Sequence, residues 1–282
     1  AILVAISPAM VFYSRYFIHE MLLAFFTLAA IGCAWRYVRH RKLRWAVCTG
    51  FCVGCMQATK ETAAIAYLAA AGAAVAVLLW SRLPGTRQAR IGLPGANVWC
   101  HLGAGTAVAI LFASLLLSSF GANPRGAFDG VLTYLPWLSR AGGDSPHIYP
   151  WWFYLKRLCW WQVDRSPFWS EGLLVLLALV GLVPALFPRA TPDSNDPQGT
   201  AKQLFLCWFA LYTLSVTLIY CVIPYKTPWC LAQFWIGFLV LAGVGGAWLL
   251  KPKLLWWRVI IAVSLAACVS YLGWQSYRTS FV

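Results

Sequence analysis

Apolar residues run along this chain in long blocks separated by short polar stretches, without the one-sided spacing of helices that face water. Blocks of about 15 to 25 such residues are long enough to cross a bilayer as helices. We therefore predict an all-α, polytopic transmembrane helix bundle. The eight predicted spans are 20–38, 45–58, 62–80, 99–118, 171–187, 204–222, 230–250 and 255–274.

The composition agrees with a membrane-embedded chain, because 61% of the 282 residues are hydrophobic and 11% are charged. Residues 1–6 are already apolar and carry no basic leader segment. We expect them to be the remnant of a further span. The sequence is thus interpreted as a fragment, 1–282, of one transmembrane domain.

Basic residues gather in one set of alternating loops, which holds 13 of the 22 lysines and arginines and two of the eight acids. The positive-inside rule predicts that this set is cytoplasmic, in a multi-pass protein of the plasma membrane. The basic excess then reports topology, and no nucleic-acid partner is expected. The set comprises Arg36, Arg39, Arg41, Lys42, Arg44, Arg82, Arg87, Arg90, Arg189, Lys202, Lys251, Lys253 and Arg258.

The opposite, extracytoplasmic face receives ionisable groups that topology does not require. The segment 7–20, with sequence SPAMVFYSRYFIHE, places Arg15, His19 and Glu20 directly before the first long span. Charged groups at such a position are costly unless they serve a site or lie at the water boundary. A functional site and an interfacial flank are both compatible with this pattern.

Lys60 and Glu61 interrupt what is otherwise a continuous helical hairpin, either as site residues or as an interfacial ion pair.

The loop 120–170 is expected to be extracytoplasmic with interfacial, tryptophan-rich helices, and Asp144 and His147 are its candidate site residues. In the turn PYKTPW, Tyr225 and Lys226 stand between two prolines that hold the cation at a fixed depth. A cation presented in this way suits a phosphate.

Phosphate-binding loops of the nucleotide-binding type do not occur in the sequence. An enzyme acting outside the cytoplasm must therefore take an activated substrate from the lipid, such as a sugar on a polyprenyl phosphate. Such chemistry needs a carboxylate, cations for the leaving phosphate and an apolar groove. Glu20 supplies the carboxylate, and Arg15, Lys60 and Lys226 supply the cations.

The segment SPAMVFYSRYFIHEMLLAFF resembles the membrane glycosyltransferases of GT-C type, especially the protein O-mannosyltransferase and aminoarabinose-transferase group. The TKE turn, the run 147–155 and the YKTPW turn resemble a dolichyl-phosphate-mannose mannosyltransferase-like branch associated by name with flippase activity. The resemblance implies a GT-C-like fold that takes part in protein glycosylation or cell-envelope assembly. The implied partners are the bilayer, a polyprenyl-phosphate sugar donor, and an acceptor glycan, lipid or protein.

The resemblance further implies roles for individual residues. Glu20 matches the second luminal acid of the family, with His19 beside it as a catalytic candidate, and Lys60 matches a lysine two spans later. Lys226 matches a late cation near the lipid phosphate, and a divalent metal ion at Glu20 is a possible cofactor. Position 20 is Glu where better-known members carry Asp, and the main catalytic acid of the family would lie upstream of Ala1.

Two functions therefore remain open at the level of sequence. The first is transfer of a sugar from the lipid-linked donor to an acceptor on the extracytoplasmic face. The alternative is a flippase, transporter or accessory protein for lipid-linked sugars. Transporters usually carry polar groups near the bilayer midplane, whereas these ionisable groups gather at one face, which favours the enzyme.

Geometry adds one requirement: about 140° separates Arg15 from Glu20 on a straight helix, so the chain must bend between them to bring both to one substrate.

Overall fold

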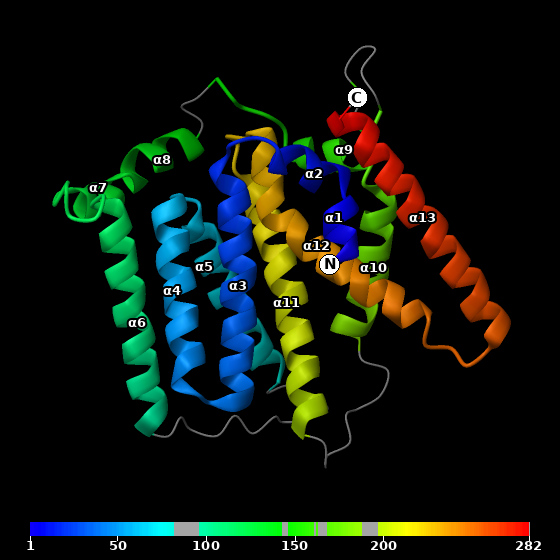
Figure 1. Cartoon of the computed structure of the whole chain (residues 1–282), viewed down its shortest axis with the longest axis horizontal. Helices are drawn as coiled ribbons and strands as arrows, with labels where there is room; N and C mark the ends of the chain where they lie inside the picture. Colours follow the sequence, from blue (N-terminus) through cyan, green and yellow to red (C-terminus); the bar gives the residue numbers. More distant parts are fainter. Residues whose placement is uncertain (82–95, 143–145, 161, 163–167, 188–196, 282) are drawn as a thin grey trace.

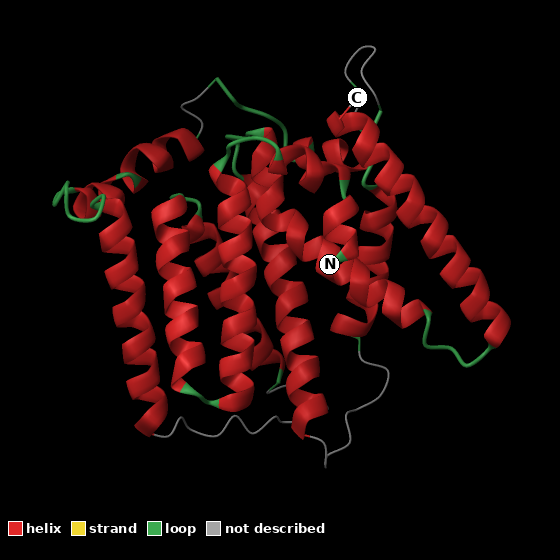
Figure 2. Ribbon diagram, viewed as in Figure 1, coloured by secondary structure: helices red, strands yellow, loops and turns green. Residues whose placement is uncertain are grey.

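The computed structural model describes residues 1–81, 96–142, 146–160, 162, 168–187 and 197–281, and within these ranges the chain is helical apart from its links and one isolated β-bridge. The bundle contains α3 (His19–His40), α4 (Leu43–Thr59), α5 (Ala63–Trp80), α6 (Ala96–Leu117), α10 (Gly172–Leu186), α11 (Pro197–Val222), α12 (Leu231–Leu249) and α13 (Leu255–Phe281) (Figure 1). The prediction of an all-α fold is confirmed for this part of the chain (Figure 2).

The eight bundle helices correspond in order to the eight predicted spans, with differences at their ends. α11 begins at Pro197 rather than at residue 204, and α13 continues to Phe281 rather than ending at 274. Among the described residues, six helices are long and apolar enough to cross a membrane: α3, α5, α6, α11, α12 and α13. α4 and α10 are shorter, with 17 and 15 residues, so a count of eight spans stays a prediction.

Five short helices and a 3₁₀ turn lie outside the bundle set. The N-terminal run forms α1 (Ile2–Ile6) and α2 (Pro8–Ser14), and the 3₁₀ turn (Pro228–Cys230) precedes α12. The loop 120–170 contains α7 (Gly126–Leu132), α8 (Tyr134–Ala141) and α9 (Phe153–Cys159). The loop thus contains helices, and their placement at a membrane interface stays a prediction.

α12 lies at the centre of the bundle, where it contacts α3, α10 and α11 and buries Trp235 and Gln233. Glycines allow its close approach to α10: a Cβ added at Gly181 would lie 2.0 Å from the Leu241 carbonyl oxygen. α6 and α13 are instead mostly exposed along their length, which is the burial expected of helices that face lipid.

The helix order brings the two classes of loop to opposite ends of the bundle (Figure 1). One end carries the start of α3, the turn between α4 and α5, the helices α7 to α9 and the residues before α12. The other end carries the described basic residues that we assigned to the cytoplasm; Arg82, Arg87, Arg90 and Arg189 lie outside the described residues. Every described site candidate lies at or beside the first end, in these links or in the chain between α2 and α3.

Candidate functional site

A buried acid is paired with a lysine at the end of the bundle where the candidate residues gather. Glu20 lies in the first turn of α3 and is 3% exposed, while Lys60 follows the last residue of α4. The Lys60 ammonium donates a hydrogen bond to Glu20 Oε1. The N-terminus of α3 also favours a negative charge at Glu20. Lys60 therefore pairs across 40 positions with Glu20, and not with its neighbour Glu61 as in the interfacial-pair interpretation.

The pair keeps Lys60 charged while its side chain stays 20% exposed. Burial opposes the charge, but the nearby Cys230 and the Glu20 carboxylate together raise the pKa of Lys60 above its ordinary value. Cys230 Sγ lies 3.8 Å from Glu20 Oε1 and 3.0 Å from the Thr227 hydroxyl. Glu20 thus holds a permanent cation at the surface of the site.

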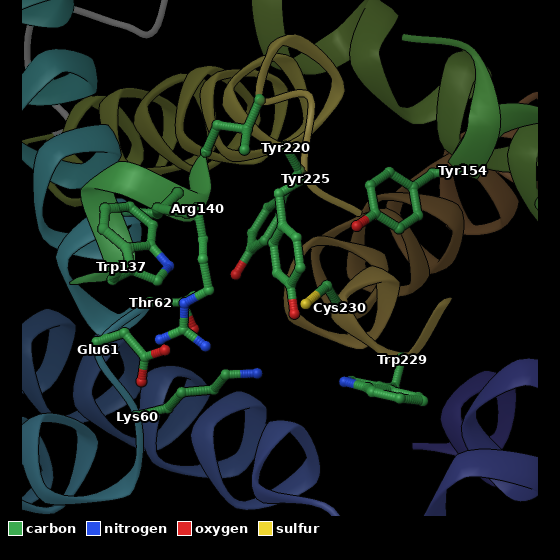
Figure 3. Close-up of a pocket in the computed structure, with 12 residues that line it drawn as sticks. Lys60, Glu61, Thr62, Trp137, Arg140, Tyr154, Tyr220, Tyr225, Trp229 and Cys230 are labelled. Carbon is green, nitrogen blue, oxygen red and sulfur yellow. The ribbon is translucent and has the colours of Figure 1, made fainter. Parts of the chain in front are cut away.

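Lys60 opens onto a cavity of about 220 Å³ at this end of the bundle. The turn between α4 and α5 contributes Lys60 and Glu61, and α8 contributes Trp137 and Arg140 (Figure 3). Aromatic side chains form much of the remaining wall, and flat rings of this kind can stack on a sugar. They are Tyr154, Tyr220, Tyr225 and Trp229.

Of the three cations predicted to bind phosphate, only Lys60 lines this cavity. The Arg15 guanidinium lies 4.4 Å from the ring centre of Phe281 at the end of α13. The chain does bend between Arg15 and Glu20, as the geometry required, because α2 ends at Ser14 and α3 begins at His19. The two side chains nevertheless have different partners: Arg15 packs on Phe281 of α13, and Glu20 pairs with Lys60.

Lys226 is 1% exposed, although the two prolines predicted a presented cation. Its ammonium donates to the Ile223 carbonyl oxygen, and burial lowers the pKa of Lys226. The backbone around it is fixed by a bridge between Ile148 and Tyr225, with the Lys226 N–H donating to the His147 carbonyl oxygen over 2.9 Å. The turn therefore positions Tyr225 at the cavity and turns its lysine inward.

The other candidates are spread over the same end of the molecule. Glu61 and Tyr225 line the cavity, and His147 places its ring 6.1 Å from that of Tyr225. His19 is exposed, with its ring 6.5 Å from that of Phe17. Asp144 lies outside the described residues.

The site was predicted without two groups that the structure singles out. Arg140 supplies a second cation to the cavity; its signal in the sequence was its position three residues after Trp137, on the same face of a helix. Glu171, the residue before α10, is a fully buried acid that accepts hydrogen bonds from the N-terminal segment. Its position at the start of a predicted span gave no sign of a partner.

The residues around Glu20 do not suit a metal ion. Within the described ranges no three His, Cys, Asp or Glu side chains come together as a metal site would require. Glu20 Oε1 accepts from the Lys60 ammonium, whose positive charge repels a cation at this carboxylate. We derive no step through a metal.

These features define a multi-helix membrane protein with a cationic, aromatic-walled cavity at one end of its bundle. Residues 1–121 match the family model described as dolichyl-phosphate-mannose-protein mannosyltransferase. The matched part contains Glu20, Lys60 and Glu61, and it agrees with the resemblance to GT-C enzymes. Neither a curated protein nor a solved structure matches the chain.

Proposed function

We propose that this protein is a membrane glycosyltransferase that moves a sugar from a polyprenyl-phosphate donor to an acceptor hydroxyl, and that the sugar is mannose. The observation that carries the proposal is the buried Glu20 that fixes Lys60 at the wall of an aromatic cavity. The family description matched by residues 1–121 names the donor, mannose on dolichyl phosphate, and a protein acceptor. We extend both to this chain, with transfer on the extracytoplasmic face.

In this reaction the acceptor oxygen forms a bond to the anomeric carbon, and the bond from that carbon to the phosphate oxygen breaks. The bonding electrons leave with the polyprenyl phosphate, so negative charge develops on the phosphate. A fixed cation stabilises that charge without reorganisation, which is the role we assign to Lys60. The acceptor proton passes to a carboxylate, and Glu61 is placed for this role because it lines the cavity beside Lys60.

Glu20 then acts on the substrate through Lys60. The Glu20 carboxylate is buried, and its Oε1 accepts a hydrogen bond from the Lys60 ammonium. Glutamine at position 20 keeps the size of the side chain and removes the charge that holds the ammonium. We expect Glu20→Gln to lower kcat by about 10² or more, the range typical of positioned charged groups.

Removing one partner of a buried pair also costs stability, about 3–5 kcal/mol, and a second variant separates the two effects. The double variant Glu20→Gln, Lys60→Met removes both charges and should recover most of the stability lost by Glu20→Gln alone. Its transfer activity should stay as low as that of the single variant. A stable double variant with wild-type transfer rates would show that the pair is structural only.

The assay is mannose transfer from dolichyl-phosphate mannose in vesicles that contain the full-length protein. The flippase alternative makes a different prediction, in which Glu20→Gln still moves the lipid-linked sugar and the wild type transfers none.

A further inference from the structure

Two cations from separate parts of the chain line the same side of the cavity. Lys60 comes from the turn between α4 and α5, and Arg140 comes from the last turn of α8. In Figure 3 the ends of Lys60, Arg140 and Glu61 lie close to one another at this side of the cavity. The cavity wall therefore carries two positive groups and one negative group.

A hydrogen bond between helices places Arg140 over that turn. The Tyr134 hydroxyl in the first turn of α8 lies 3.0 Å from the Gln57 amide nitrogen in the last turn of α4. Gln57 is three residues before Lys60, so the bond fixes α8 beside the lysine. Arg140 also donates from Nε to the Pro136 carbonyl oxygen over 3.3 Å, which orients the guanidinium group.

We propose that Arg140 and Lys60 together form a clamp for the phosphate of a prenyl lipid, with Glu61 balancing Arg140 when no phosphate is bound. The inference rests on the proposed function and adds the residue and the ligand chemistry of its leaving-group site. A guanidinium group binds phosphate through a planar pair of donors, and an ammonium group acts beside it as a point charge. The residues of the clamp are held by separate contacts, Lys60 by Glu20 and α8 by Gln57.

The surroundings of α8 favour a lipid phosphate over a free one. α8 carries Arg140, and the exposed side chains of α7 and α8 include five large apolar ones: Phe128, Val131, Leu132, Leu135 and Leu138. A phosphate seated between Lys60 and Arg140 can therefore carry a hydrocarbon chain that lies along these helices. Free phosphate gains nothing from this surface.

The clamp is matched to the charge that appears during transfer. The donor is a phosphodiester with one negative charge, and breaking its bond to the sugar gives a monoester that carries up to two. A second cation then stabilises the transition state more than the bound donor, and such a group contributes to kcat more than to KM. Product polyprenyl phosphate should also bind more tightly than the donor.

Binding can be measured apart from transfer by isothermal titration calorimetry, which does not depend on turnover. The probes are farnesyl phosphate, farnesol and inorganic phosphate, added to the full-length protein in lipid nanodiscs. Arg140→Gln should weaken farnesyl phosphate binding at least about tenfold, with Arg140→Lys between Gln and the wild type. Farnesol binding should not change.

Arg125→Gln is the matched control, since Arg125 is an exposed arginine of the same loop that does not line the cavity. It should bind farnesyl phosphate as the wild type does. Equal binding by Arg140→Gln and the wild type would overturn the clamp. Inorganic phosphate that bound as tightly as farnesyl phosphate would overturn the lipid assignment.

The outcome for the clamp is separable from that for the proposed function. A wild type that transfers mannose, with an Arg140→Gln variant of unchanged kcat and unchanged binding, refutes the clamp alone. A wild type that transfers no sugar but binds farnesyl phosphate through Arg140 refutes the transferase and leaves the clamp standing.

Discussion

Glu171 offers a test of the packing that holds the N-terminal segment on the bundle. Its carboxyl group is 0% exposed, and Oε1 accepts from the Ser7 hydroxyl at 2.6 Å and from the Ala9 N–H at 2.7 Å. The Trp235 indole donates to the same Ser7 oxygen over 3.0 Å. Burial raises the pKa of Glu171 from 4.5 to about 7, although the hydrogen bonds from Ser7 and Ala9 act in the opposite direction.

The raised pKa makes stability depend on pH with a defined sign. The folded protein keeps its proton on Glu171 between about pH 4.5 and pH 7, where the unfolded chain has lost it. The contribution of Glu171 is therefore complete below pH 4.5, falls as the pH rises, and is lost above about pH 7. A shift of this size corresponds to about 3 kcal/mol.

Glu171→Gln imitates the protonated side chain, because the amide oxygen can still accept from Ser7 and Ala9 and the group cannot ionise. We expect a variant as stable as the wild type near pH 4.5 and more stable, by up to about 3 kcal/mol, at pH 8. The measurement is thermal unfolding in detergent micelles across this pH range, followed by tryptophan fluorescence. The difference between variant and wild type isolates Glu171 from other titrating groups.

Asp129→Asn is the control, since Asp129 is an exposed acid of α7. Its difference from the wild type should stay flat with pH. A flat difference for Glu171→Gln as well, or one that falls as the pH rises, would refute the reasoning from burial.

Two further predictions concern topology and packing. Cysteine placed at position 125 should react with an impermeant reagent in intact cells and cysteine at position 41 should not, on a background without native cysteines; the reverse pattern would invert the membrane orientation. Gly181→Val should destabilise the protein by more than about 2 kcal/mol, because its Cβ would lie 2.0 Å from the Leu241 carbonyl oxygen. Gly72→Val is the matched control, as nothing lies within 4 Å of a Cβ there, and equal melting temperatures for the two variants would contradict the packing argument.

The sequence allowed the helices to be located, because apolar blocks of this length fold as helices wherever lipid surrounds them. It did not reveal where each helix ends: α13 continues seven residues beyond the predicted end, to Phe281, because its last turns pack on the N-terminal helices. Ser276 in that part donates to the Ile6 carbonyl oxygen. Contacts of this kind join segments that are far apart in the chain, and periodicity carries no information on them.

The sequence predicted where the candidate site lies better than it predicted which side chains contact each other there. Charges that interrupt apolar blocks marked Glu20 and Lys60, and the structure pairs them. The direction of each side chain followed from local packing instead. Lys226, between its prolines, turns toward the Ile223 carbonyl oxygen, and Arg15 turns toward Phe281.

Arg140 is a site residue that the sequence did not predict. An arginine in a long, aromatic loop resembles an interfacial anchor, and nothing in the local pattern around Arg140 points to the turn between α4 and α5. The Gln57–Tyr134 contact places it there. That contact joins positions 77 residues apart, and a single sequence does not indicate such pairs.

The central claim is that this protein breaks the bond between a sugar and a polyprenyl phosphate and passes the sugar to an acceptor. The most direct measurement follows both products in vesicles that contain purified full-length protein, dolichyl-phosphate mannose labelled in the sugar, and an acceptor peptide rich in serine and threonine. We predict labelled peptide and free dolichyl phosphate in equal amounts, with both products nearly absent for Glu20→Gln. Labelled donor that crosses the bilayer while neither product forms would contradict the claim.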